Sequence, residues 1–131
     1  MIENIMRFKV QYADTDAYGV MWHGAYLRYM EMGRVELLED YGIKIDKLQK
    51  EQDVIMPVIE LDIQYKFSAK LMDECVLRTK IIDLTKTTVT FLQEIYIEDT
   101  KKLSTSATVR ATALKGGKIS RHVDEFFKER V

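Results

Sequence analysis

The sequence predicts an α+β protein in which one curved antiparallel β-sheet wraps around a single long central helix. Two observations support this fold class. Over residues 23–41, apolar side chains recur with the 3.6-residue period of a helix. From residue 55 to residue 113, apolar and polar residues alternate with the two-residue period of strands that have one buried and one solvated face. Only one long helix is available to cover the buried face, and a curved sheet is the economical way to let it do so.

The composition indicates one soluble globular domain over residues 1–131, with 47% hydrophobic and 31% charged residues. Twenty Lys and Arg against 21 Asp and Glu leave a formal charge of −1, so no nucleic-acid-binding surface is expected. No apolar run approaches the ~20 residues of a membrane span, and charges in the first twenty residues predict no secretory signal. The single Cys75 excludes an internal disulfide and suits a reducing compartment, so a cytoplasmic location is expected.

A short strand is expected to lead through a turn near Asp14 into the helix. Its alternating apolar positions are Met6, Phe8, Val10 and Tyr12. The apolar face of the helix carries Tyr26, Met30, Gly33, Leu37 and Tyr41. Because glycine costs about 1 kcal/mol relative to alanine inside a helix, we infer that Gly33 lets another backbone approach closely. Gly42 is expected to end the helix, and residues 44–52 to form a helical turn or loop.

The second half of the sequence is a run of strands whose apolar positions share one parity in each strand. These strands are expected around residues 55–67, 75–81, 89–97 and 103–113. Their connections, residues 68–73, 83–87 and 98–102, are short enough to join antiparallel neighbours. The last strand carries small residues that leave room for the helix: Ala107, Ala111 and Ala113.

Two further surfaces are expected from the same pattern. The outer face of the sheet is not fully polar, since it includes Val76, Ile82, Leu92 and Tyr96. An apolar patch on an outer face often marks a subunit contact, so a homo-oligomer is expected. Near the end of the chain, a short amphipathic turn that packs on the rim is expected from Val123, Phe126, Phe127 and Val131.

The join between the first strand and the helix concentrates ionisable residues: Asp14, Asp16 and His23. One aspartate is expected to cap the turn and the other to be free for chemistry, but their spacing does not decide which. The first N–H groups of a helix have no internal partner, so they stabilise an oxygen that gains negative charge. His23 at this position can donate hydrogen bonds to a substrate carbonyl through its ring and its backbone. The only other histidine, His122, is expected to be solvated.

Other common chemistries lack their motifs. The two histidines and one cysteine are too widely spaced for a recognisable metal site, so no metal is expected. Gly116-Gly117 is followed by neither the lysine nor the helix of a phosphate-binding loop, and no nucleophile elbow presents a serine. We therefore expect carboxylate-driven chemistry without a cofactor, assisted by His23 and the start of the helix.

In these residues the chain resembles the hotdog-fold acyl-CoA thioesterases of the 4-hydroxybenzoyl-CoA thioesterase type, and most closely the small bacterial thioesterases associated with the Tol–Pal cluster. The matching motif is Tyr12-x-Asp14-Thr15-Asp16-x-x-Gly19-Val20-x-x-His23-x-x-Tyr26, continued by Tyr29-x-Glu31-x-x-Arg34-x-Glu36-x-Leu38. A weaker likeness continues through residues 57–60, 65–67 and 117–121. One departure is that Phe67-Ser68-Ala69 replaces the family's usual proline after Tyr65-Lys66.

The resemblance implies a hotdog fold and hydrolysis of an acyl-CoA thioester to a free carboxylic acid and coenzyme A. By this pattern Asp16 is the catalytic carboxylate, acting as nucleophile or general base, and Asp14 is its structural companion. His23 is expected beside Asp16 as a second catalytic residue. His23, Gly24 and Tyr26 form the expected oxyanion and substrate-binding set. The resemblance also implies a homodimer, often paired into a homotetramer, with each active site at a subunit interface.

Two alternatives remain open at this point. A hotdog dehydratase or hydratase would use a histidine with a carboxylate along the central helix, where Glu31 and Glu36 are available, but it leaves the Asp-x-Asp turn unexplained. A non-catalytic acyl-CoA-binding module would keep its function after Asp16→Ala. The identity of the acyl group is also open, because Met21, Trp22 and the tyrosines suit an aliphatic or an aromatic group equally well.

Overall fold

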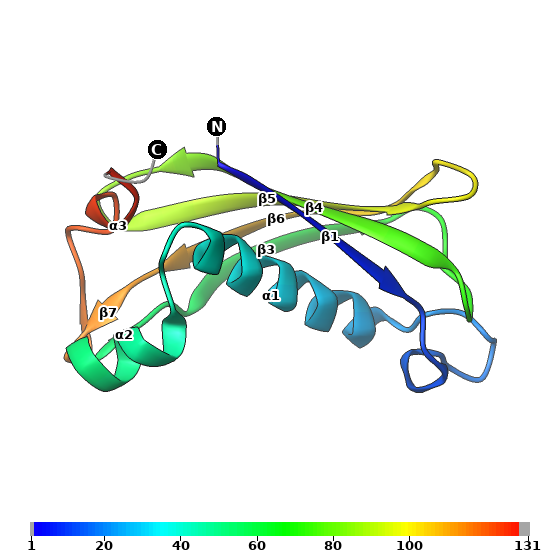
Figure 1. Cartoon of the computed structure of the whole chain (residues 1–131), viewed down its shortest axis with the longest axis horizontal. Coiled ribbons are helices and arrows are strands. Elements are labelled where there is room, and N and C mark those ends of the chain that lie inside the picture. Colours follow the sequence, from blue (N-terminus) through cyan, green and yellow to red (C-terminus); the bar gives the residue numbers. More distant parts are fainter. Residues whose placement is uncertain (1, 129–131) are drawn as a thin grey trace.

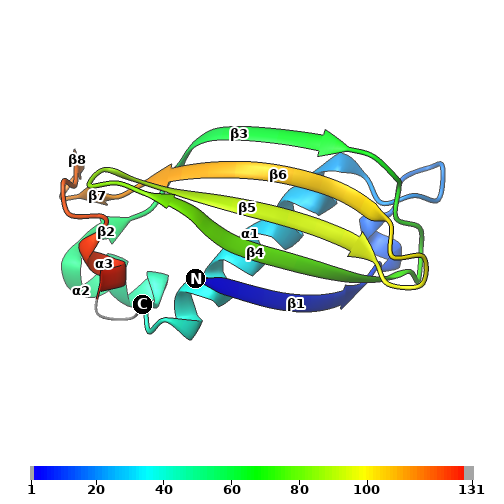
Figure 2. The ribbon, with the colours of Figure 1, turned by 90° about the horizontal axis from the view of Figure 1, so that it is seen from above.

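The computed structural model describes residues 2–128 and consists of a curved antiparallel sheet over one long helix (Figure 1, Figure 2). The main sheet has the strand order β1-β4-β5-β6-β3. Its strands are β1 (Glu3–Lys9), β3 (Val58–Tyr65), β4 (Glu74–Leu84), β5 (Thr88–Ile97) and β6 (Leu103–Thr112). A small second sheet contains β2 (Val54–Ile55), β7 (Leu114–Lys115) and β8 (Lys118–Ile119). The helices are α1 (His23–Asp40), α2 (Ile45–Gln52) and α3 (Glu125–Lys128), with a 3-10 turn η1 (Tyr12–Asp14). The predicted fold class is confirmed.

Helix α1 is the central helix that the apolar period predicts. It begins at His23 and ends at Asp40, and Gly42 follows in a left-handed conformation with φ of 78°. Its buried face consists of Ala25, Tyr26, Tyr29, Met30, Gly33, Leu37 and Leu38. This face packs chiefly against β1 and β4, so the strands on that side of the sheet share the core with the helix. Tyr41 is only half-buried, because the helix has already ended there.

The inference about Gly33 was wrong in one respect, because side chains rather than a backbone approach it. An ideal Cβ at this position would lie 2.6 Å from Leu77 Cδ2 and 2.9 Å from Thr79 Oγ1, both on β4. Leu77 and Thr79 are fully buried, so neither has space to move away. The glycine is therefore needed to seat α1 on the sheet.

We expect Gly33→Val to lower the free energy of unfolding by about 2 kcal/mol, since overpacking a filled core costs about 1–3 kcal/mol. Urea unfolding of the wild type and the variant measures this difference. Met32→Val on the exposed side of the same helix serves as the control and should change stability by no more than about 0.5 kcal/mol. A Gly33→Val protein as stable as the wild type would contradict this packing.

The connection between β3 and β4 differs from the prediction. These strands are not neighbours, because β5 and β6 lie between them. Residues 66–73 instead cross the end of the sheet and bond to the segments that precede α1: Met21 N–H donates to Ala69 C=O (2.7 Å), and Val10 N–H donates to Asp73 C=O (2.9 Å). The hairpins at residues 85–87 and 98–102 do join antiparallel neighbours. The crossing segment brings residues 66–70 next to the start of the helix.

Strand β3 is exposed on both faces, although its odd-numbered apolar residues were expected to be buried. Ile59 is 52% exposed and Leu61 is 42% exposed. The reason is that α1 packs under β1 and β4, at the far end of the strand order from β3. The concave side of β3 is therefore left largely uncovered. Ala107, Ala111 and Ala113, in contrast, are buried as expected.

Three smaller predictions can be compared with the structure. Residues 45–52 form helix α2, so the helical interpretation of that segment is the correct one. Tyr12 is 82% exposed rather than inward-facing, because β1 ends at Lys9 and the chain turns into η1. Val123 and Phe127 are buried in the C-terminal segment, whereas Val131 lies outside the described residues. Among residues 2–128, no helix is both long enough and apolar enough to span a membrane.

Candidate active site

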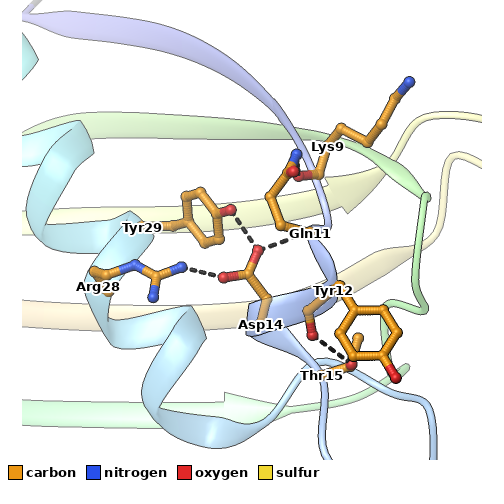
Figure 3. Close-up of polar contacts among 7 residues, drawn as sticks. All are labelled: Lys9, Gln11, Tyr12, Asp14, Thr15, Arg28 and Tyr29. Atoms are coloured by element: carbon orange, nitrogen blue, oxygen red, sulfur yellow. Dashed lines mark hydrogen bonds and ion pairs between the residues drawn. The ribbon is translucent and has the colours of Figure 1, made fainter.

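Asp14 ties the turn before α1 to the helix itself (Figure 3). Its side chain is 1% exposed. One oxygen, Oδ2, accepts hydrogen bonds from the Gln11 backbone N–H (2.9 Å) and from the Tyr29 hydroxyl (2.5 Å). The other, Oδ1, is ion-paired with the Arg28 guanidinium. The Asp14 carbonyl also accepts from the Trp22 N–H (3.0 Å), so both parts of the residue hold the turn against the first turns of α1.

The electrostatics of this cluster favour an ionised Asp14. Burial opposes ionisation, but the hydrogen bonds from Tyr29, Gln11 and Arg28 outweigh it and hold the pKa of Asp14 below its ordinary value. The pKa of the Tyr29 hydroxyl is raised, because burial and the nearby Asp14 carboxylate both disfavour its ionised form. Asp14 is thus a permanently charged anchor at neutral pH.

Asp16 lies two residues further on and is exposed. Its Oδ1 accepts the Tyr18 backbone N–H (2.8 Å), which makes a local turn, and Gly19 completes that turn with φ of 77°. No residue between 2 and 128 donates a hydrogen bond to Oδ2. The expectation that one aspartate caps the turn and the other is free is correct only in part, because each accepts a backbone N–H. Only Asp16 keeps a carboxylate oxygen without a donor among the described residues.

Asp16 and His23 line one small pocket of about 110 Å³. The lining also includes Val20, Met21, Tyr26, Tyr65, Lys66, Phe67 and Ser68. The backbone N–H groups of His23 and Gly24 have no acceptor among the described residues, as expected for the first positions of a helix. A carboxylate, an imidazole and two unpaired N–H donors are thus gathered at the start of α1.

Gly24 and Tyr26 have structural duties in this arrangement. A Cβ at Gly24 would lie only 2.2 Å from an atom of the Trp22 ring, so that ring packs on the glycine. The Tyr26 hydroxyl is buried, accepts the Ala69 N–H (2.9 Å) and is 3.0 Å from Ser104 Oγ. Tyr26 therefore meets the pocket with its ring, while its hydroxyl holds the crossing segment.

The pocket lining also includes Tyr65, Phe67 and Ser68, and of these sequence reasoning assigned Tyr65 no individual role at the site. Tyr65 was interpreted only as an inward position of a strand. The available signal was the family likeness over residues 65–67, but nothing in the local pattern indicates that these residues reach the start of α1. That contact depends on the crossing connection.

A second and larger cavity, of about 600 Å³, lies between α1, α2, β2 and the start of β3. Its lining is mainly apolar and includes Val35, Met56, Pro57, Val58, Phe91 and Ala111. Arg34 also reaches it and donates a hydrogen bond to Gln93 Oε1 (2.8 Å), while burial lowers its pKa. Within this chain the cavity does not include Asp16 or His23.

Nothing in the described part of the chain assembles a metal site: no group of three or more His, Cys, Asp and Glu side chains among residues 2–128 is placed to hold an ion. Cys75 is buried in the core, and burial raises the pKa of its thiol to about 12, so it is no nucleophile at neutral pH.

A curved antiparallel sheet wrapped around one long helix is the architecture of the hotdog fold. Residues 10–127 match the thioesterase-like superfamily. The acyl-CoA thioesterase YbgC of Haemophilus influenzae is 34% identical over 121 residues, which cover 91% of this chain and 88% of that protein. The chain belongs to the thioesterase-like superfamily.

Solved structures agree with this assignment. A DHNA-CoA thioesterase from Staphylococcus aureus aligns with a TM-score of 0.87 at 25% identity, covering 98% of this chain and 86% of that one. A 4-hydroxybenzoyl CoA thioesterase mutant complexed with 4-hydroxybenzoyl CoA aligns with a TM-score of 0.89 over the full length of both chains. At 12% identity, this second likeness concerns the fold alone.

Proposed function

We propose that this protein hydrolyses an acyl-CoA thioester to a free acid and coenzyme A, with Asp16 as the reacting carboxylate. The observation that carries the proposal is the pocket that Asp16 and His23 line at the start of α1, in a chain of the thioesterase-like superfamily. Thiol release from a panel of aliphatic and aromatic acyl-CoA esters tests the activity and identifies the acyl group. Absence of thiol release across the panel would contradict the proposal.

The proposed chemistry begins with polarisation of the thioester carbonyl. Its oxygen accepts hydrogen bonds from the His23 imidazole N–H and from the backbone N–H groups of His23 and Gly24, where the helix dipole favours negative charge. In the general-base route, Asp16 removes a proton from water as the water oxygen attacks the carbonyl carbon. The C–S bond then breaks, and the departing thiolate takes up a proton.

In the nucleophilic route, the open Oδ2 of Asp16 attacks the carbonyl and forms a mixed anhydride as the thiolate leaves. Water then opens the anhydride and restores the carboxylate. A single turnover in ¹⁸O-labelled water distinguishes the routes, because only the nucleophilic one can place label in the Asp16 carboxylate. Mass spectrometry of the peptide that contains Asp16 detects it.

The dehydratase alternative gains no support from the structure. His23 lies eight positions before Glu31 on α1, which separates them by about 12 Å along the helix axis. Glu31 and Glu36 therefore have no histidine beside them on the helix. The Asp16 turn, in contrast, has both a cleft and a histidine.

We further propose that the protein is a homodimer that forms through the free edge of β3. Among residues 2–128 this strand pairs only with β6, so its other edge presents backbone N–H and C=O groups that no described strand pairs. The concave side of β3 also exposes Val58, Leu61 and Tyr65, which no element of the same chain covers fully. A second copy that pairs antiparallel with this edge would satisfy the backbone and cover the apolar side chains.

Antiparallel pairing places the start of β3 in one subunit beside the end of β3 in its partner. The large cavity lies at the start of β3, and the Asp16 pocket lies at its end. The two would therefore adjoin across the interface, and the apolar cavity of one subunit would receive the acyl group held at the other's Asp16. Pairing of dimers into a tetramer would use the outer face around Ile82, Leu92 and Tyr96.

We expect Leu61→Lys to break the dimer, because it places a charge on the concave side of the edge that the partner covers. The dissociation constant should rise at least about 100-fold, and activity should fall in proportion to the dimer lost. Sedimentation velocity across a range of concentrations measures this. Thr100→Lys, at the exposed tip of the β5–β6 hairpin and away from both proposed contacts, should leave the dimer intact. A wild-type protein that sediments as a monomer, or a Leu61→Lys dimer of normal strength, would refute the β3 interface.

A further inference from the structure

The His23 imidazole is held by a ring contact rather than by hydrogen bonds. Its ring stacks on Tyr65, with centroids 4.3 Å apart and planes inclined by 20°. No residue in the described range 2–128 makes a hydrogen bond or ion pair with the His23 side chain. Because His23 is exposed at the first position of α1, rotation about its side-chain bonds is otherwise unrestrained. Tyr65 is therefore the contact that fixes the direction of this imidazole.

Tyr65 is itself firmly placed. It is the last residue of β3 and pairs with Thr105 of β6. Its ring makes an edge contact with the Tyr26 ring, with centroids 5.3 Å apart and planes at 74°. Its hydroxyl lies 3.4 Å from the His23 carbonyl, which it can bond weakly as a donor. The pairing of β3 with β6 fixes the Tyr65 backbone, and the Tyr26 ring supports the Tyr65 ring against the His23 imidazole.

Tyr26 is in turn fixed by hydrogen bonds whose directions can be assigned. Ser104 Oγ donates its proton to the Phe67 carbonyl, so the proton between Tyr26 and Ser104 must come from the tyrosine. The Tyr26 oxygen then accepts the Ala69 N–H. This buried chain of hydrogen bonds locks the Tyr26 ring and the crossing segment together. A rigid interior thus extends through Tyr26 and Tyr65 to an otherwise free histidine.

We propose that Tyr65 is a positioning residue of the reaction, which acts by holding the His23 ring toward the pocket that Asp16 lines. This inference rests on the proposed role of His23. The ring of Tyr65 carries the function, and its hydroxyl contributes little.

Two substitutions at position 65 separate the ring from the hydroxyl. Tyr65→Phe keeps the stack, so its kcat should stay within about threefold of the wild type. Tyr65→Leu removes the stack, so kcat should fall by about 10- to 100-fold with a much smaller change in KM, as expected when a catalytic group loses its alignment. Urea unfolding and sedimentation of both variants check that fold and dimer are retained, since Tyr65 is 39% exposed.

The same substitution in a His23→Ala background tests whether Tyr65 acts through the histidine. Tyr65→Leu should then cost no more than about twofold beyond His23→Ala alone, because the two changes remove one coupled unit. Equal losses in both backgrounds would overturn the proposal. The proposal would also be overturned if Tyr65→Leu kept full activity while His23→Ala lost activity. Full activity of His23→Ala would instead refute the proposed role of His23 itself, and the positioning role with it.

Proton NMR gives a readout that requires no activity. The chain has only two histidines, so exposed His122 serves as an internal reference. The ring-proton resonances of His23 should be displaced by the Tyr65 ring in the wild type and in Tyr65→Phe. In Tyr65→Leu they should move toward the His122 positions. Unchanged His23 resonances in Tyr65→Leu would show that the stack does not form in solution and would overturn the inference.

Discussion

Asp16→Asn should fold as the wild type does and lose a factor of about 10²–10⁴ in kcat, which is the contribution expected from a positioned base. The fold is retained because Asn keeps the side-chain oxygen that accepts the Tyr18 N–H. Asp16 is exposed and no other described group bonds its side chain, so stability should change by no more than about 0.5 kcal/mol. What the amide lacks is the negative oxygen that attacks the carbonyl or takes a proton from water.

Steady-state release of coenzyme A measures this loss, with circular dichroism and sedimentation to verify the fold. Asp83→Asn is the matched control, since it makes the same change at another exposed carboxylate that does not line the pocket. It should retain full activity. An Asp16→Asn enzyme with near-normal turnover would eliminate Asp16 as the reacting carboxylate.

Asp14→Ala should cause the largest loss of stability, about 2–3 kcal/mol in the free energy of unfolding. The substitution leaves the buried Tyr29 hydroxyl and the Gln11 N–H without their acceptor, and each unsatisfied buried group costs about 1–3 kcal/mol. The Arg28 side chain is 53% exposed, so water replaces its partner at little cost. Urea unfolding at neutral pH measures the loss, and Asp83→Asn again provides the control. Unchanged stability would show that this cluster does not hold the turn.

The stability that Asp14 contributes should also depend on pH. Its pKa is lower in the folded protein than in the unfolded chain, where aspartate titrates near about 3.9. The contribution is therefore fully present above the unfolded pKa and is lost as pH falls through the folded pKa. The stability difference between the wild type and Asp14→Asn should be constant above about pH 5 and shrink below about pH 4. A difference that stays constant through this acid range would contradict an ionised, anchored Asp14.

Local patterns predicted the elements that depend on local spacing. The 3.6-residue period gave the bounds of α1 to within one residue, and Gly42 ended the helix in the left-handed conformation expected of it. Alternation likewise predicted β4, β5 and β6 with the correct buried faces. Fold class and family membership are both confirmed.

The errors concern relations between distant segments. Residues 58–65 do form a strand, but its apolar residues are largely exposed because α1 packs under β1 and β4 rather than under β3, which no local pattern encodes. The side chains around Gly33 and the route of residues 66–73 both follow from the strand order. The short connection between β3 and β4 had suggested that these strands are neighbours, which they are not. The contact between Tyr65 and His23 was not predicted for the same reason, since the two residues lie 42 positions apart in the sequence.

The most direct test of the central claim is a single turnover of acyl-CoA by Asp16→Asn, with enzyme in excess and binding measured separately. The proposed chemistry predicts a complex that forms with nearly normal affinity while its thioester remains intact over many wild-type turnover times. Cleavage of the bound thioester at the wild-type rate would contradict it.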